Sequence, residues 1–160
     1  MKRLLSSAVA ALVLGSIATA MCPFTTLFFQ YGAGCAPSTQ APPILNGQVD
    51  GGMTCGVMID LNVQQPCGHC GVFVKSEWLI LGVQAVNIPI SNGCALLVSP
   101  DIMLPLPPAI GSTVLQGDLP HDPSLIGKSF YMQGVIERVA TFGNTTDIEV
   151  SNGLEMRIVP

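Results

Sequence analysis

The chain has few charged residues, and basic residues are the scarcest of them. Asp, Glu, Lys and Arg together make up 10% of its 160 residues, against about 25% in an average soluble protein. Beyond the first three residues only four basic residues oppose ten acidic ones, which gives that part a net charge of −6. No basic stripe exists, so we expect the protein to bind neither nucleic acid nor anionic lipid.

Two further patterns are missing. No stretch after residue 20 has apolar residues at helical spacing, which argues against α-helices in that part of the chain. No glycine-x-serine-x-glycine motif is present, so the sequence does not indicate a serine hydrolase. The small number of titratable side chains leaves little for acid–base catalysis. We therefore expect a protein that is not an enzyme and needs no cofactor.

The first 20 residues have the three parts of a secretory signal peptide. Two basic residues begin the segment, an apolar run over residues 4–17 follows, and Ala18-Thr19-Ala20 fits a signal peptidase. We expect cleavage after Ala20 and a single domain over residues 21–160. That domain would be extracellular, at the cell surface or in the periplasm, without a membrane contact after cleavage.

Two alternatives to a cleaved signal peptide remain open. The first is a membrane anchor, although the apolar run is shorter than the roughly 20 residues that a spanning helix needs. The second is a lipoprotein, because Cys22 follows the apolar run closely. Lipidation favours a small residue before the cysteine, and Met21 is not small.

Short apolar runs separated by turn residues predict an all-β fold. We expect an antiparallel β-sandwich of jelly-roll or Greek-key type, with seven to nine strands. A bulge is expected near Gly134, turns at Asn46-Gly47 and Asn152-Gly153, and no regular structure around Pro105 to Pro108. The strands are expected over residues 25–31, 54–63, 94–99, 113–119, 129–140, 147–150 and 154–159. Residues 72–74 and 78–84 are expected to form one strand or a pair, and residues 86–90 are a candidate edge strand.

Five short motifs occur together in the chain: Tyr31-Gly32-Ala33-Gly34-Cys35, Gly93-Cys94-Ala95-Leu96-Leu97-Val98-Ser99-Pro100, Leu119-Pro120-His121-Asp122-Pro123-Ser124-Leu125-Ile126-Gly127, Phe130-Tyr131-Met132-Gln133 and Ser151-Asn152-Gly153-Leu154. As a set they resemble a domain family of secreted proteins from planctomycete-type bacteria. The resemblance covers roughly residues 31–160, and the proline-rich third motif is its most specific part. It implies a secreted β-domain and brings no catalytic residues with it.

The resemblance also implies one disulfide. The family pattern includes cysteines like Cys35 and Cys94, which suggests that these two are bonded to each other. Cys55, Cys67 and Cys70 are additions to the pattern, so the resemblance does not assign them. Export to an oxidising compartment favours disulfides for them too, but six cysteines allow 15 pairings.

The sharpest local motif is Cys67-Gly68-His69-Cys70, which matches the redox tetrapeptide of disulfide isomerases. Redox catalysis needs the first cysteine at the start of a helix, where its pKa is lowered, and β-type residues follow Cys70 instead. We expect a structural loop with Cys55 as a candidate disulfide partner. Zinc binding by Cys55, Cys67, His69 and Cys70 is the alternative.

Three titratable residues, Asp118, His121 and Asp122, lie close together in the sequence. Such residues serve as metal ligands or as catalytic bases. Their setting around Pro120 and Pro123 instead indicates the end of a strand and a turn. We expect the turn and keep the three residues as ligand candidates.

Two aromatic residues, Trp78 and Tyr131, are candidates for stacking on a sugar ring, although packing in the core is the simpler interpretation. Together these observations predict a secreted, disulfide-stabilised structural or interaction domain, with extracellular proteins or glycans as partners. A carbohydrate-binding module is the alternative, and a thiol-disulfide oxidoreductase is less favoured.

Overall fold

The computed structural model describes residues 21–37, 41–64, 72–108, 111–140 and 146–160. In these residues the chain forms ten β-strands, two 3-10 turns and no α-helix. The strands are β1 (Thr25–Tyr31), β2 (Ile44–Asp50), β3 (Gly56–Val63), β4 (Val72–Gly82), β5 (Ala85–Pro89), β6 (Ala95–Val98), β7 (Ile102–Leu106), β8 (Gly111–Asp118), β9 (Ser129–Ala140) and β10 (Thr146–Val159). Among these residues there is no helix with the length and apolar character needed to cross a membrane.

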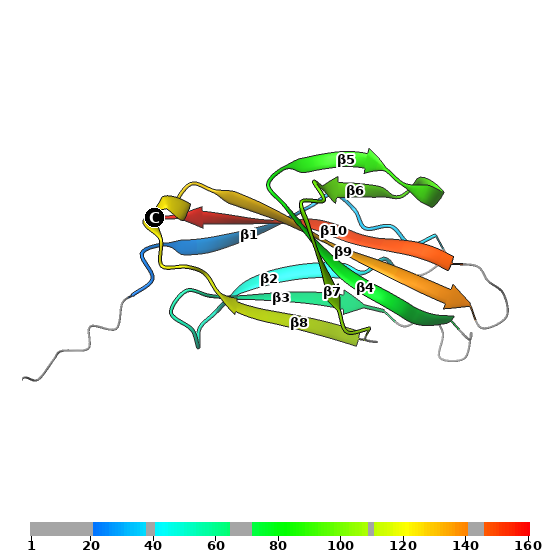
Figure 1. The fold of residues 1–160 in the computed structure, drawn as a ribbon, viewed down its shortest axis with the longest axis horizontal. Coiled ribbons are helices and arrows are strands. Elements are labelled where there is room, and N and C mark those ends of the chain that lie inside the picture. The colour runs from blue at the N-terminus through cyan, green and yellow to red at the C-terminus, as the bar shows by residue number, and fades with distance from the viewer. Residues whose placement is uncertain (1–20, 38–40, 65–71, 109–110, 141–145) are drawn as a thin grey trace, which may run out of the picture.

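The strands form three antiparallel layers. A five-stranded sheet in the order β1-β10-β9-β4-β7 is the central layer, and a three-stranded sheet in the order β2-β3-β8 covers one of its faces. The β5–β6 hairpin lies on the opposite face (Figure 1). The predicted all-β antiparallel sandwich is therefore confirmed.

The main core lies between the two larger sheets. In β3, alternate residues point inward, and Val57, Ile59, Leu61 and Val63 are all buried there. They pack against inward residues of the central sheet, such as Ile136. This period of two is what a strand with one buried face requires.

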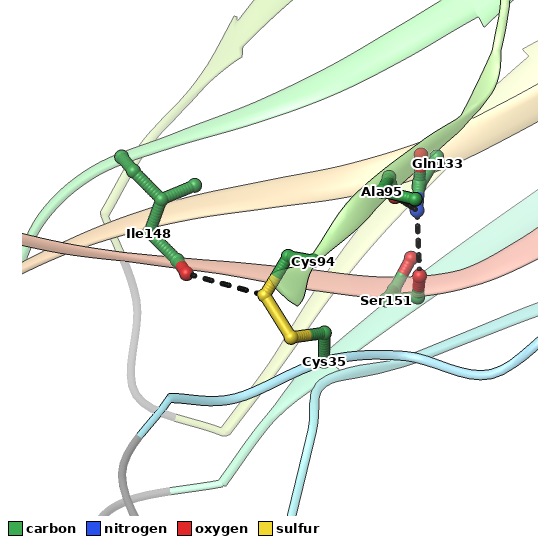
Figure 2. Close-up of a disulfide and its surroundings, with 6 residues drawn as sticks. All are labelled: Cys35, Cys94, Ala95, Gln133, Ile148 and Ser151. Carbon is green, nitrogen blue, oxygen red and sulfur yellow. Dashed lines mark hydrogen bonds between the residues drawn. A yellow bond between two sulfur atoms is a disulfide. The ribbon is translucent and has the colours of Figure 1, made fainter. Parts of the chain in front are cut away.

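The β5–β6 hairpin is attached to the central sheet by polar as well as apolar contacts. The fully buried Gln133 of β9 accepts a hydrogen bond from the Leu97 N–H (2.8 Å) and donates to the carbonyl oxygens of Ser151 (2.8 Å) and Ala95 (3.3 Å). Figure 2 shows the Gln133 side chain between Ala95 on the hairpin and Ser151 on β10. Because β9 is covered on both faces, its middle is buried without interruption from Met132 to Ile136.

A disulfide fixes the same hairpin to the segment that follows β1. Cys94, just before β6, is bonded to Cys35 (Figure 2). This is the pair that the resemblance implies. The Cys35 backbone also exchanges two hydrogen bonds with Val150 of β10, at 2.7 and 2.9 Å, so both ends of the disulfide rest on the central sheet.

The second disulfide differs from the expectation for Cys55. Cys55 is bonded to Cys22, so its predicted pairing within the loop of Cys67 and Cys70 is wrong. Local patterns do not link Cys22 to the start of β3, because this contact joins segments that are distant in the sequence. Cys67 and Cys70 themselves lie outside the described residues.

Strands were missed where glycine or proline indicated a turn. Asn46-Gly47 lies in the middle of β2, because the ring of Phe28 occupies the space where a side chain at Gly47 would stand. Pro105 lies in β7, which is tolerated because β7 is the edge of its sheet. Expected breaks around Lys75 in β4 and at Asn152 in β10 are bulges within single long strands.

Candidate functional site

The interior of the sandwich is uncovered at one end of β8. Along this edge strand, the inward residues change from buried at Thr113 to half-buried at Leu115 and exposed at Gly117. All three lie beside buried positions of β3, with Gly117 paired to Val57. The loss of cover is therefore on the β8 side of the interior.

The edge strand of the other sheet shows the same change in the same direction. The inward residues of β7 pair with Leu79 and Leu81 of β4, and their exposed fraction rises from 7% at Leu106 to 39% at Leu104 and 55% at Ile102. No third strand lies between β7 and β8 among the described residues. On the opposite side the sandwich is closed, because β2 packs against β1 and β10.

An apolar cavity of about 480 Å³ occupies the uncovered end. Its floor is formed by Phe130, Met132 and Met156 of the central sheet, and Leu115 and Leu104 contribute from the two edge strands. Small-molecule sites usually have volumes of about 300–1,000 Å³ and mostly apolar walls. Methionine side chains are flexible and adapt to the shape of a bound molecule.

Gly117 helps to keep this cavity open. Its position on β8 faces inward, yet a side-chain carbon built there would meet no atom within 4 Å. The other inward positions of β3 and β8 near it carry Val57 and Leu115. A larger residue at position 117 would therefore fill part of the cavity from the β8 side.

The volume is too large for a packing defect. A sealed empty void of this size would cost on the order of 10 kcal/mol, as much as the whole stability of a typical domain. Native cores rarely contain voids larger than a water molecule. The exposed inner residues of β7 and β8 show that the cavity instead opens to solvent between the two edge strands.

Few polar groups line the cavity. The side chain of Asp101, at the start of β7, accepts hydrogen bonds from the Val83 N–H and the Ser99 hydroxyl, both at 2.9 Å. It thereby holds the β4–β5 turn to the start of β7. The other polar residue is Gln116, which lies at an exposed position of β8 between the inward Leu115 and Gly117. Neither arrangement offers an acid–base pair aimed at a bound molecule.

The other end of the same interior is polar and filled. Arg138 and Glu149 form an ion pair of 2.7 Å, with exposed side-chain fractions of 3% and 0%. The Arg138 guanidinium also donates to the carbonyl oxygen of Gln64 (2.6 Å). Glu77, equally buried, lies two residues before Leu79 on the inner face of β4. Charge and hydrogen bonds thus occupy this end of the layer.

Two of the three titratable residues near Pro120, Asp118 and Asp122, take part in separate local hydrogen bonds. The Asp118 carboxylate accepts a hydrogen bond from the Cys55 N–H (2.9 Å). Asp122 caps the 3-10 turn at Pro123–Leu125 by accepting from the Ser124 N–H (2.9 Å), and this hydrogen bond lowers the pKa of its carboxyl group. The expected turn is present there.

Three potential metal ligands lie close together here, but one of them is not available to bind a metal. Ligand atoms of Cys55, Asp118 and His121 lie within 4.8 Å of one another. The sulfur of Cys55 is bonded to Cys22, and a metal requires the free thiolate. Asp122 is not in the group, and His69, Cys67 and Cys70 of the zinc alternative lie outside the described residues.

Trp78 and Tyr131 lie on the face of the central sheet that carries the β5–β6 hairpin, and both pack against the same apolar cluster there. They are separated by four residues along paired strands, roughly 13 Å. The Tyr131 ring packs edge-on against Tyr31 at 6.0 Å, and burial raises the pKa of Tyr31 to about 12, assisted by the Tyr131 hydroxyl. Both candidate rings are half-buried, and their offset along the strands keeps them from stacking on the same sugar ring.

Reasoning from sequence did not identify the cavity. Its signals in the sequence are an absent side chain at Gly117 and the apolar residues Ile102 and Leu104, which lie just before the prolines at 105–108. Comparison of the chain with family models, with curated proteins and with solved structures finds no match. The resemblance to the planctomycete-type secreted domains therefore stays a prediction, and the function has to be argued from the site.

Proposed function

We propose that this protein is a secreted, disulfide-stabilised interaction domain that binds an apolar ligand between its two larger sheets. The observation that carries the proposal is the cavity of about 480 Å³ between β7 and β8. Its walls are apolar, it is open to solvent, and an inward position, Gly117, is left without a side chain. Transfer of an apolar molecule from water into such a site is favourable.

Secretion is supported by chemistry from two parts of the chain. Two disulfides are typical of proteins that fold in an oxidising compartment. The first 20 residues have the composition of a signal peptide. We propose export followed by cleavage after Ala20, and a role outside the cytosol or at the cell surface.

A role in binding without catalysis fits the chemistry of the cavity. Its one carboxylate, Asp101, is engaged in holding a turn. The described residues that line it include no histidine, cysteine or lysine. Binding of glycans is the weaker proposal, because Tyr131 is packed against Tyr31 and Trp78 lies some distance along the sheet.

The proposal is tested with N-phenyl-1-naphthylamine, an uncharged dye that fluoresces in apolar sites. We expect saturable binding by residues 21–160. Gly117→Leu should weaken binding at least about tenfold, because the new side chain occupies the space a ligand would use. The matched control is Val114→Leu, which enlarges an exposed outer residue of the same strand.

Both variants should be folded, as judged by circular dichroism, before binding is compared. Dye binding that is absent in the unmodified domain would overturn the proposal. So would binding that is the same in the Gly117→Leu and Val114→Leu variants, because the dye would then lie elsewhere on the protein.

A further inference from the structure

Building on the proposed function, we infer that the ligand of the cavity is an uncharged lipid-like molecule, such as a long-chain alcohol or ester, and that the cavity discriminates against anionic lipids. The inference rests on where the charges of the chain lie relative to the mouth between β7 and β8. A free fatty acid is the natural competitor, since it has the same hydrocarbon chain and a carboxylate at one end.

No cation lines the cavity among the described residues. Beyond the first 20 residues the chain has four basic side chains. Three of them are paired with carboxylates elsewhere: Lys75 with Glu137, Arg138 with Glu149, and Arg157 with Glu155. The fourth, Lys128, follows the 3-10 turn at Pro123–Leu125 and is not among the residues that line the cavity.

The one charged residue among those that line the cavity is acidic. Asp101 directly precedes Ile102, and its carboxylate is bonded to the β4–β5 turn at this end of the sandwich. Its two hydrogen-bond donors, the Val83 N–H and the Ser99 hydroxyl, are neutral, so no partner cancels its charge. The anionic head of a fatty acid at the mouth would meet a like charge.

Placing the carboxylate head of a fatty acid inside the cavity is also unfavourable. A carboxylate that enters an apolar site without a hydrogen-bonded counter-charge loses much of its hydration free energy. The hydroxyl of an alcohol carries no net charge and loses less. At the mouth, which is open to solvent, water can bond to a hydroxyl.

The strand β7 offers a matched pair of positions to test this reasoning. Ile102 and Met103 are adjacent and similarly exposed, at 55% and 53%. Ile102 faces inward and lines the cavity, whereas Met103 faces the other side of the sheet. Ile102→Lys places a cation at the mouth, and Met103→Lys adds the same charge outside it.

The experiment measures displacement of N-phenyl-1-naphthylamine by three molecules of equal chain length at pH 7.5: 1-decanol, decanoate and decylammonium. In the unmodified domain we expect decanol to displace the dye at a concentration at least about tenfold below that of decanoate. Decylammonium should fall between them, because the Asp101 carboxylate attracts it. Ile102→Lys should lower the decanoate concentration several-fold, and Met103→Lys should leave it unchanged.

The outcomes separate this inference from the function on which it rests. Equal displacement by decanol and decanoate would overturn the charge discrimination and leave the apolar site standing. An unchanged decanoate value in a folded Ile102→Lys variant, or an equal gain in Met103→Lys, would also overturn it. Failure of the dye and of decanol alike to bind would remove the proposed function itself.

Discussion

The two ends of the layer between the main sheets have opposite character. At one end, which we call the ion-pair end, Arg138 and Glu149 are fully buried and bonded to each other. At the other, the cavity end, Gly117 and Ile102 flank an open apolar space. Met132 and Arg138 of β9 mark the two ends and are six residues apart, roughly 20 Å.

This contrast suggests that stability and binding are located in different parts of one core. A buried ion pair constrains its surroundings, because either partner left alone in the interior is strongly unfavourable. An open apolar site contributes less packing, but it can accept a molecule without displacing side chains. The strands β4, β9 and β10 run continuously from one end to the other. The rigid packing of the ion-pair end can therefore maintain the backbone conformation at the cavity end.

The largest effect is expected at the ion-pair end. Arg138→Met should lower the free energy of unfolding by about 4 kcal/mol, because it leaves the Glu149 carboxylate buried without its counter-charge. Urea denaturation measures the loss. The control is Arg157→Met, because the Arg157 side chain is half-exposed in its pair with Glu155, and this change should cost less than about 1 kcal/mol. Equal losses in the two variants would contradict the assignment of stability to this end.

Removal of each disulfide should have a similar effect on stability but a different effect on binding. Removing either one by a double change to alanine should cost about 3 kcal/mol. The Cys22–Cys55 bond supports the cavity end, because the Cys55 carbonyl oxygen accepts from the N–H of Leu119, a residue that lines the cavity. Its loss should weaken dye binding, whereas loss of Cys35–Cys94 should not.

Dye titration and urea denaturation of both double variants test this, at a temperature where each is folded. The idea that the cavity end depends on its own disulfide would be wrong if binding fell equally in the two variants.

A smaller effect of opposite sign is expected from Gly117→Leu. The added side chain buries apolar area and a strand glycine is removed, so the free energy of unfolding should rise by about 1 kcal/mol. Denaturation midpoints of Gly117→Leu and Val114→Leu measure the difference. A destabilised Gly117→Leu variant would show that the space beside β8 is smaller than described.

Much of the fold follows from local pattern. The expected bounds of β1 and β9 coincide with Thr25–Tyr31 and Ser129–Ala140, because both have clear apolar residues and turn signals at each end. A bulge was expected near Gly134, and the structure has an irregularity opposite this residue, with the extra residue on β10. Local chemistry gives such features because the interactions that define them lie close in sequence.

The rest depends on contacts between distant segments. Gly47 is compatible with β2 only because Phe28 covers it, and Pro105 with β7 only because no strand lies beyond that edge. Of the candidate ligands that are close in sequence, Asp118 and His121 come together with Cys55, whereas Asp122 is not in that group. The cavity is invisible to motif analysis, because it is defined by the absence of a side chain and by two uncovered edges.

The most direct test of the central claim uses the methionines of the domain as reporters. With ¹³C-labelled methionine methyl groups, nuclear magnetic resonance spectra are recorded while 1-decanol is added to residues 21–160. Met132 and Met156 line the cavity, whereas the other four methionines, Met21, Met53, Met58 and Met103, do not. We expect the Met132 and Met156 signals to shift together and saturate while the other four stay in place. Stationary Met132 and Met156 signals, or shifts spread equally over all six, would contradict an apolar binding site between β7 and β8.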